Sequence, residues 1–367
     1  MQGTCLLRAV ITVILFFLPV LATAAELPTA LSDQEFWRMV TEFSEAGGAF
    51  QLELMSNEDS AQFVIPALKQ TTRPGGVYIG VGPEQNFTYI AAIQPRLAFV
   101  VDIRRDNMLQ HLLYKALFEL ASDRADFLGR LFSRKRPLGA DMSASVKSLF
   151  EGFEAAEPDA ALYDENLAAI LDRLSTRHGF PLTDADRSRI AVFMNTFRAA
   201  GPYMLRGSGD KNLTYVQAMS GSDLTGLNQS YLASEENFKR VQELERQNLI
   251  VPLVGDFAGD KTIVNIGQYL KSRDAIVNVF YVSNVERYLW DQGARGKQFY
   301  TNAAALPLDP SSTFIRSVTS DISRRLGVRL PDGTANWRSF LAPMADSLKA
   351  FTEGRVQTYR EMFEIVR

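Results

Sequence analysis

The sequence is poor in the residues from which metal sites and nucleophiles are most often built. Its 367 residues include one cysteine and two histidines. Cys5 lies ahead of an apolar N-terminal run, so a chain that loses this segment has no thiol. This excludes disulfides, zinc-thiolate sites and cysteine nucleophiles from the mature chain. With so few histidines and no G-x-S-x-G, H-E-x-x-H or Walker lysine motif, metal sites and hydrolase triads are also disfavoured.

Long runs of charge of one sign are also missing. The net charge is −3, and charged residues make up 22% of the chain beside 46% hydrophobic residues. This balance is typical of a globular protein and predicts no nucleic-acid partner. A local basic cluster is interpreted as a solvated loop; it comprises Arg130, Arg134, Lys135 and Arg136. The chain shows no repeat with a period of about 20 to 50 residues, which disfavours solenoids and propellers.

The N-terminus has the order of segments found in a secretory signal. Arg8 precedes an uncharged apolar run, Ala9–Leu21, and small residues follow at positions 22–25. A retained membrane anchor is the alternative, but the run is shorter than the roughly 20 residues that a spanning helix needs, and Pro19 interrupts it. We therefore expect residues 1–25 to be a signal peptide, and the mature protein to be periplasmic or secreted with no stable membrane span.

Residues 77–102 contain two apolar runs with a glycine turn after the first, which is the order of a βαβ unit. The expected elements are a strand Val77–Ile79, a turn that begins Gly80-Val81-Gly82-Pro83, a helix Thr88–Ile93, and a strand Leu97–Val101 that ends in Asp102. This order, with an acid about 20 residues beyond the glycines, is found in proteins that bind a dinucleotide or an adenosyl group. Gly80 and Gly82 would let the backbone approach a ligand, and Asp102 would accept hydrogen bonds from ribose hydroxyls.

These residues resemble a known family. The turn Gly80-Val81-Gly82-Pro83 is similar to motif I of class I S-adenosylmethionine-dependent methyltransferases, and Asp102 corresponds to the acid that ends their second strand. The resemblance implies a Rossmann-like fold with S-adenosylmethionine as cofactor. The chain departs from the family in having Tyr78 where an acid is usual and Glu84 where a third glycine is usual. The run from Gly76 through Arg105 also resembles a group of exported bacterial proteins with a methyltransferase-like domain and no established activity.

Glu84, at the start of the predicted helix, separates the possible cofactors. A carboxylate there repels a dinucleotide pyrophosphate and favours the ammonium group of S-adenosylmethionine. The alternative is that Glu84 only caps its own helix, because acids are common at helix starts. Both interpretations remain open at this point.

Helices are expected on both sides of the βαβ unit. The predicted helices are one that Asp33 caps and that ends at Gly47 and Gly48, one over Ser60–Lys69, one from Asn107 to Leu120, and two in an insertion, Leu162–Leu174 and Asp184–Phe197. Residues 26–70 are therefore interpreted as a helical cap and 71–120 as the first half of a Rossmann-like domain. His111 is expected to be a packed or a surface residue of its helix rather than a catalyst.

Residues 121–234 interrupt the alternation of strands and helices and are interpreted as a largely helical insertion. Insertions at the carboxyl edge of such sheets often shape a substrate pocket. Four polar or aromatic residues are candidates for substrate contact, namely Tyr203, Arg206, Tyr215 and Gln217. The alternative is that the aromatic members only anchor a loop by packing.

The second half of the Rossmann-like domain is expected over residues 235–330, followed by a C-terminal helix in 331–367. The predicted elements are a helix Glu235–Gln247, a strand Leu249–Val254, a helix Lys261–Ser272, a strand Ala275–Val282, strands Gln298–Ala303 and Thr313–Val318, and a terminal helix Trp337–Val366. The fold class is therefore α/β, with a doubly wound, mostly parallel sheet.

The resemblance also implies positions for the remaining site residues. In the methyltransferases the end of the third strand supplies an acid near the adenine, which here is Asp256. The end of the fourth strand borders the reacting methyl group, which here gives Ser283, Asn284 and Glu286. Helix capping is the alternative role for Asp256 and Asn284.

Two functions of different kinds follow from these observations. One is an S-adenosylmethionine-dependent methyltransferase, in which positioning supplies much of the catalysis and no metal is required. The other is an exported, non-catalytic binding or structural domain that keeps the fold and has lost cofactor chemistry, as the compartment and the departures at Tyr78 and Glu84 suggest. The partner would be a small molecule or a protein, and fold alone does not decide between the two.

Overall fold

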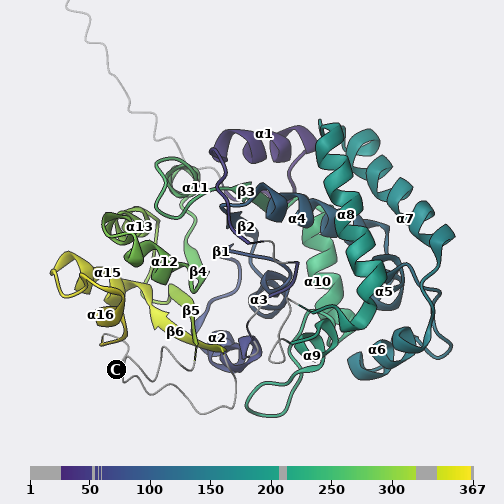
Figure 1. Cartoon of the computed structure of the whole chain (residues 1–367). Coiled ribbons are helices and arrows are strands. Elements are labelled where there is room, and N and C mark those ends of the chain that lie inside the picture. Colours follow the sequence, from purple (N-terminus) through teal and green to yellow (C-terminus); the bar gives the residue numbers. More distant parts are fainter. Residues whose placement is uncertain are drawn as a thin grey trace, which may run out of the picture.

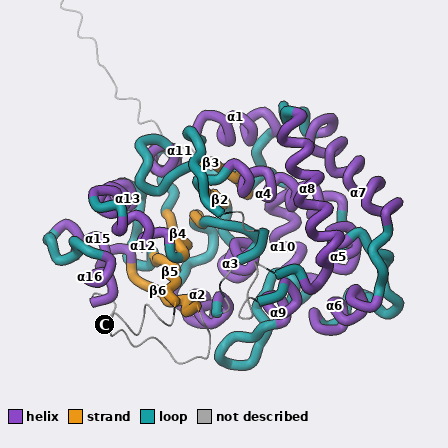
Figure 2. The backbone as a smooth tube through the Cα atoms, viewed as in Figure 1, coloured by secondary structure: helices purple, strands orange, loops and turns teal. Residues whose placement is uncertain are grey.

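A computed structural model describes residues 26–51, 54–56, 58, 60–205, 213–319 and 337–364. The predicted signal segment and the substrate candidate Arg206 lie outside the described residues. Figures 1 and 2 show strands through the middle of the molecule, with the helices of the insertion gathered on one side and the described helices of residues 262–304 and 344–364 on the other. Within the described residues, no helix combines the length and apolar character needed to cross a membrane.

The central sheet confirms the predicted fold class. Its six strands are β1 Val77–Gly80, β2 Leu97–Asp102, β3 Ile250–Val254, β4 Val277–Ser283, β5 Thr313–Thr319 and β6 Trp337–Pro343. Their order is β3-β2-β1-β4-β5-β6, and all neighbours are parallel except β5 and β6. Every residue of β1, β2 and β3 is buried, as expected for apolar strands covered by helices on both faces.

The strand order determines where a ligand would bind. From β1 the chain runs outward to β2 and β3, then returns to place β4 on the other side of β1. Ligands of open α/β sheets bind outside the carboxyl ends of the strands at such a reversal. The candidate site is therefore the crevice beyond the ends of β1 and β4.

The helices of the first half agree with the prediction in position but start earlier. They are α3 Gln85–Ile93 and α4 Arg105–Leu120, and they pack with α10 Glu235–Arg246. The helix α3 was expected to begin at Thr88, but the chain enters it directly from the glycine turn. Almost all of α4 is buried, so it is a core helix rather than an amphipathic surface helix.

The N-terminal cap contains helices α1 Asp33–Phe43 and α2 Ile65–Thr71, with a 3-10 helix η1 Ala61–Val64 before α2. The prediction that Asp33 caps α1 was wrong, because Ser32 is the N-cap and forms a capping box with Glu35. The prediction that α1 extends to Gly47 was also wrong, since the helix ends at Phe43.

The insertion is helical, as predicted. Its elements are α5 Arg124–Phe132, α6 Val146–Ala155, α7 Ala160–Asp172, the π-helix η2 Arg173–Arg177, α8 Asp184–Ala200, the 3-10 helix η3 Gly201–Tyr203 and α9 Tyr215–Ser220. The basic cluster, however, is not a solvated loop throughout. Arg134 donates to the carbonyl oxygens of Phe153 and Ala156 at the end of α6, and Arg136 forms an ion pair with Asp123.

Two predictions near the C-terminus were wrong. The expected strand Gln298–Ala303 lies within the helix α13 Ala294–Ala304, because Phe299, Tyr300 and Ala303 are buried at helical spacing. The other helices of this region are α11 Thr262–Lys271 and α12 Val285–Asp291.

The expected terminal helix Trp337–Val366 instead begins with the edge strand β6. It continues as α15 Met344–Thr352 and α16 Tyr359–Glu364. Pro343 ends the strand and is the N-cap of α15, and Gly354, with φ +74°, ends that helix region. A proline and a glycine in these places break the continuous helix that the composition suggested.

Candidate functional site

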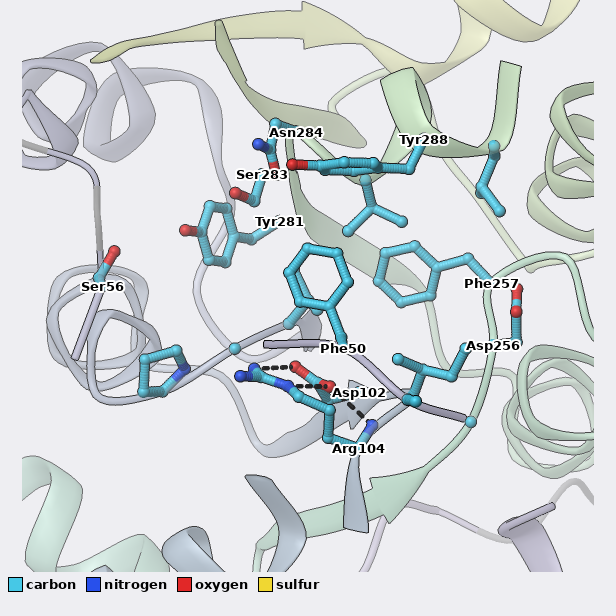
Figure 3. A pocket seen from close by; sticks show the side chains of 18 of the residues that line it. Phe50, Ser56, Asp102, Arg104, Asp256, Phe257, Tyr281, Ser283, Asn284 and Tyr288 are labelled. Atoms are coloured by element: carbon cyan, nitrogen blue, oxygen red, sulfur yellow. Dashed lines mark hydrogen bonds and ion pairs between the residues drawn. The ribbon is translucent and has the colours of Figure 1, made fainter. Parts of the chain in front are cut away.

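A cavity of about 220 Å³ lies at the carboxyl ends of β1 to β4 (Figure 3). The residues that line it from the strand ends are Gly82 after β1, Asp102 and Arg104 at β2, Asp256 and Phe257 after β3, and Tyr281, Ser283 and Asn284 at β4. Five of the seven predicted cofactor-binding residues therefore line one cavity, and Gly80 and Glu84 do not.

The N-terminal strap, defined as residues 44–51, crosses the cavity from outside the sheet. The N–H of Gly48 donates to the carbonyl oxygen of Ile103 at 2.8 Å. A Cβ atom at Gly48 would lie 2.5 Å from the Ile103 side chain, so any other residue here would require that side chain to move. Gly47 and Gly48, predicted to end a helix, thus let the strap lie against the residue that follows β2.

Aromatic side chains form much of the cavity wall. Phe50 of the strap and Tyr288 of α12 are in edge-to-face contact, with ring centroids 5.3 Å apart, and Figure 3 shows Phe50 beside Arg104. Phe257 and Tyr281 add two further rings. Phe50 is 45% exposed, so the strap holds a large apolar side chain at the mouth of the cavity.

Gly82 has the backbone conformation that the predicted turn requires. Its φ is +78°, and a Cβ atom there would meet nothing within 4 Å, so the conformation rather than space selects glycine. Its carbonyl oxygen accepts hydrogen bonds from Asn86 at 3.0 Å and His111 at 2.9 Å. Asn86 also donates to the carbonyl oxygen of Val81, so the N–H of Gly82, in the same peptide, points away from Asn86.

Gly80 serves a different purpose from the predicted approach of a ligand. A Cβ atom there would lie 2.0 Å from Asn86 Oδ1 and 2.6 Å from the phenol of Tyr78. The Tyr78 hydroxyl donates to the same Asn86 oxygen at 2.9 Å, and both side chains are fully buried. The protein's own side chains therefore fill the space beneath the turn, and Tyr78, where the resembling family has an acid, is one of them.

Glu84 does not cap its own helix with its side chain, which was one of its two expected roles. Its carboxylate is fully buried and accepts the backbone N–H of Ser56 at 3.0 and 3.1 Å. It makes no side-chain hydrogen bond to the start of α3, although it is the N-cap residue. Glu84 therefore fixes Ser56, which lines the cavity, to the glycine turn.

Asp102 lies at the predicted place but is paired within the protein. Its Oδ1 accepts from the backbone N and the Nε of Arg104 at 2.8 and 2.9 Å, and its Oδ2 accepts from Nη2 at 2.7 Å (Figure 3). Both side chains are nearly buried. A carboxylate has about four acceptor positions, and three are used here. About one acceptor position remains for any other group.

Asp256 is also paired. Its Oδ2 accepts from Arg295, and its Oδ1 accepts the backbone N–H of Ala258 at 2.8 Å. The two acids that line the cavity thus each have an arginine partner. The cavity carries little uncompensated charge, which disfavours a charged ligand.

The polar residues at the end of β4, Ser283 and Asn284, have no arginine partner among the described residues, unlike the two acids at β2 and β3. Ser283 has φ +50°, and the register of β4 on β5 shifts between Tyr281 and Ser283. The Ser283 hydroxyl donates to Glu58, while the Asn284 side chain makes no hydrogen bond to any described residue. Both residues line the cavity.

Glu286, which was also expected at the end of β4, does not line the cavity. Its carboxylate is buried and bonds Arg316 at 2.6 and 3.1 Å and the Tyr300 hydroxyl at 3.0 Å. This pair joins α12, α13 and β5 and has a structural role.

Glu58 is the main residue that the sequence did not indicate. It is 4% exposed and lies among the hydroxyls of Ser283, Ser339, Ser317 and Tyr281. Burial raises its pKa, although hydrogen bonds from these hydroxyls act in the opposite direction. Because Glu58 and Ser283 are far apart in sequence, no local motif could have revealed the contact.

His111 is packed in the interior, and neither histidine lines the cavity. Burial lowers the pKa of His111 to about 4, so the neutral ring donates from Nε2 to the carbonyl oxygen of Gly82. His178 lies between Asp33 and Glu119, with contacts of 2.6 and 2.7 Å, outside the cavity.

The three substrate candidates of the insertion that the structure describes, Tyr203, Tyr215 and Gln217, do not line the cavity. Tyr215 is buried and shares a hydrogen bond with Tyr231, whereas Tyr203 is exposed. Gln217 belongs to the capping box of α9. Among the residues that the structure describes, no cluster of three or more histidine, cysteine or carboxylate side chains could hold a metal ion.

Comparison with known proteins identifies a family but no activity. No curated protein matches the chain. A family described as a domain of unknown function, DUF7790, matches residues 54–365, which include the whole sheet and every cavity residue except those of the N-terminal strap. Because this match covers most of the sequence, the chain belongs to the DUF7790 family.

Proposed function

We propose that this protein binds a small, uncharged molecule with a planar ring in the cavity at the carboxyl edge of β1 to β4, and that it has lost the use of S-adenosylmethionine. The observation that carries the proposal is the pairing of Asp102 with Arg104 on both carboxylate oxygens. With its acids neutralised and four aromatic rings in its wall, the cavity favours stacking and apolar contact over charge recognition.

The residues present do not fit S-adenosylmethionine well. The acid that would accept the ribose hydroxyls is occupied, and the space under Gly80 is filled by Asn86 and Tyr78. Glu84, which would attract the ammonium group, instead binds the backbone of Ser56. Each residue that the family resemblance assigned to the first half of a cofactor site thus has a partner inside the protein.

The second candidate is an S-adenosylmethionine-dependent methyltransferase. The observation in its favour is that Gly82, Asp102, Asp256, Ser283 and Asn284 line one cavity at the expected edge of the sheet. This candidate requires that Arg104 leave Asp102 when the cofactor binds. The cost of separating a nearly buried ion pair makes this the weaker candidate.

A ligand screen tests the first proposal. We expect thermal-shift and calorimetric titrations to find binding among uncharged planar compounds, with adenine and adenosine in the panel. Phe50→Ala should weaken that binding about tenfold, because it removes a ring at the cavity mouth.

The matched control is Tyr203→Ala, which removes another exposed aromatic ring, outside the cavity. It should leave the affinity unchanged. Equal loss of affinity in both variants, or no binding by any uncharged planar compound, would count against the proposal.

We also propose that the protein is exported and that its N-terminal segment is removed. The support is the arrangement of Arg8, the apolar run Ala9–Leu21 and the small residues that follow. N-terminal sequencing of the protein recovered from a fractionated bacterial host tests this, with a start near residue 25 or 26 in the periplasm or medium expected. An intact N-terminus in the cytoplasmic fraction would contradict it.

A further inference from the structure

A buried carboxyl group lies behind the cavity wall, and within the described part of the chain it has no cationic partner. Glu58 is nearly buried, and no lysine or arginine of the described residues forms an ion pair with it. Among the described residues, the polar groups that interact with its carboxyl are hydroxyls. Those that hydrogen-bond to it come from Ser283 and Tyr281 of β4, Ser317 of β5 and Ser339 of β6, and the phenols of Tyr78 and Tyr89 interact with it electrostatically. Burying a carboxyl group costs free energy unless hydrogen bonds compensate for it, and here hydroxyl groups provide those bonds.

The hydrogen bonds around Glu58 orient it toward Ser283. Ser283 donates to Oε1, and Ser339 donates to Oε2 at 3.2 Å. The backbone N–H of Ser339 is in turn held by the Ser60 hydroxyl at 2.9 Å. The carboxyl group thus has one oxygen fixed by β6 and the other on a serine that lines the cavity.

Ser283 itself is held in an unusual conformation. A left-handed φ of +50° is uncommon for a residue other than glycine, and it occurs here at the end of a parallel strand, directly before α12. Strained residues at such strand ends are a frequent feature of functional sites. Asn284, the next residue, lines the same cavity, and its amide has no hydrogen-bond partner among the described residues.

We propose that Ser283 is a nucleophile with Glu58 as its general base, and that the cavity hydrolyses small uncharged esters without a cofactor. This rests on the proposed function, since it requires that a small molecule occupy the cavity. A serine hydrogen-bonded to a base, with an amide donor beside it, is the minimal arrangement for acyl transfer. The aromatic wall and the paired acids favour an ester that is uncharged and carries a planar group.

The reaction balances with water as the only co-reactant. An electron pair of Ser283 Oγ attacks the ester carbon while its proton passes to Glu58 Oε1, and the carbonyl oxygen becomes an oxyanion to which the Asn284 amide donates. The C–O bond to the alcohol then breaks, and the alcohol oxygen takes the proton from Glu58. Water hydrolyses the acylated Ser283 in the same way, giving a carboxylic acid and returning the proton to Oγ.

Burial also favours Glu58 as a base. It raises the pKa of this carboxyl, which strengthens the conjugate base near neutral pH, even though hydrogen bonds from Ser283, Ser317, Tyr281 and Ser339 oppose the shift. A group that must lose its proton before it can act as a base gives a rate that rises with pH. Reaction at Ser283 should therefore increase as the pH rises through the pKa of Glu58.

Covalent labelling of the full chain with an alkyl fluorophosphonate, followed by peptide mass spectrometry, tests the proposal. We expect one main adduct, on Ser283, at a rate that rises with pH. Ser283→Ala should abolish it, and Glu58→Gln should slow it about 100-fold or more, the loss typical of a missing general base. Circular dichroism checks that each variant is folded.

Two further variants keep the test decisive. Ser143→Ala is the matched control, because Ser143 also donates to a carboxylate, Asp141, at 2.6 Å but lies outside the cavity. It should label as the wild type does. If Glu58→Gln fails to fold, Glu58→Asp replaces it; its shorter carboxylate should slow labelling at least tenfold.

The outcomes separate this proposal from the proposed function. The assignment of Ser283 as a nucleophile activated by Glu58 would be overturned if the folded wild type forms no adduct on Ser283. It would also be overturned if the adduct forms at the same rate in Glu58→Gln and at every pH. Binding of an uncharged planar ligand without an adduct would overturn the nucleophile and leave the proposed function standing. Absence of both binding and labelling would overturn both.

Discussion

The two halves of the cavity wall use their polar groups in opposite ways. At the ends of β1 and β2, the glycine turn is held by Asn86 and His111, and Asp102 is paired with Arg104. At the end of β4, Ser283 and Asn284 line the cavity, and the Asn284 amide has no partner among the described residues. The half that resembles a cofactor site is therefore satisfied internally, whereas the other half retains groups that a ligand can use.

The difference shows how a recognisable motif can be kept for structural reasons. Gly80 leaves room for buried side chains, and Gly82 provides a left-handed turn. Asp102 holds Arg104, which in turn donates to the carbonyl oxygen of Gln51 in the N-terminal strap. The same residue types that would cradle an adenosyl group here join β1, β2 and the strap.

The largest expected effect comes from breaking the ion pair of the first half. Arg104→Gln leaves Asp102 nearly buried without its cation, which should lower the free energy of unfolding by about 3–5 kcal/mol. Chemical denaturation measures the change. The double variant Asp102→Asn with Arg104→Gln should recover a large part of it, whereas a loss below about 1 kcal/mol in the single variant would mean that Asp102 is not a structural residue.

The next largest effect should come from Gly80. In Gly80→Ala the new methyl group would lie 2.0 Å from Asn86 Oδ1 and 2.6 Å from the Tyr78 ring, so we expect a loss of about 3 kcal/mol in the free energy of unfolding. Gly82→Ala, where only the positive φ opposes a side chain, should cost about 1–2 kcal/mol. Equal losses in the two variants would contradict the distinction between a packing glycine and a turn glycine.

A pH-dependent effect should come from His111. Burial lowers its pKa to about 4, so between pH 6.5 and pH 4 the unfolded chain binds a proton at this position that the folded chain does not. The stability it provides is complete above the unfolded pKa and is lost as the pH falls toward 4, by roughly 2–3 kcal/mol.

The variant His111→Gln isolates this contribution, because glutamine can still donate to the Gly82 carbonyl oxygen but does not titrate. Denaturation curves at pH 7, 5.5 and 4.5 should show a smaller loss of stability in the variant than in the wild type. Parallel losses in both would mean that His111 is not held neutral in the folded state.

The smallest expected effect on stability is that of Phe50→Ala. Phe50 is 45% exposed on the N-terminal strap, so its removal should change the free energy of unfolding by less than about 0.5 kcal/mol. A melting curve of Phe50→Ala therefore shows whether a loss of ligand binding comes from the missing ring at the cavity mouth or from unfolding of the protein. A large destabilisation would instead mean that the strap is part of the core.

The first half of the fold could be predicted because its signals are local. Apolar runs gave β1, which lies between glycines, and β2, which follows Pro95 and ends at Asp102, and helical spacing gave α4 and α8. Ser32, the residue before Asp33, with Glu35 three positions on, carries the capping-box pattern and identifies the true N-cap of α1. The helix α13 was predicted as a strand, although the spacing of Phe299, Tyr300 and Ala303 is typical of a helix.

The site could be predicted only in part, because its residues meet across the sheet. Strand ends bring Gly82, Asp102, Asp256, Ser283 and Asn284 together, and this follows from the βαβ order. The pairing of Asp102 with Arg104 could have been expected from the sequence, because the arginine follows the acid by two positions. The contact of Glu58 with Ser283 had none, since it depends on how the N-terminal segment crosses the sheet edge.

The central claim is that the Asp102 carboxylate binds Arg104 and does not bind a ribose. Calorimetric titration of the wild-type protein with S-adenosylmethionine tests it most directly. The account predicts no binding at micromolar concentrations, and no gain or loss when Asp102→Asn is titrated beside it. Micromolar binding of S-adenosylmethionine by the wild type that Asp102→Asn abolishes would contradict it.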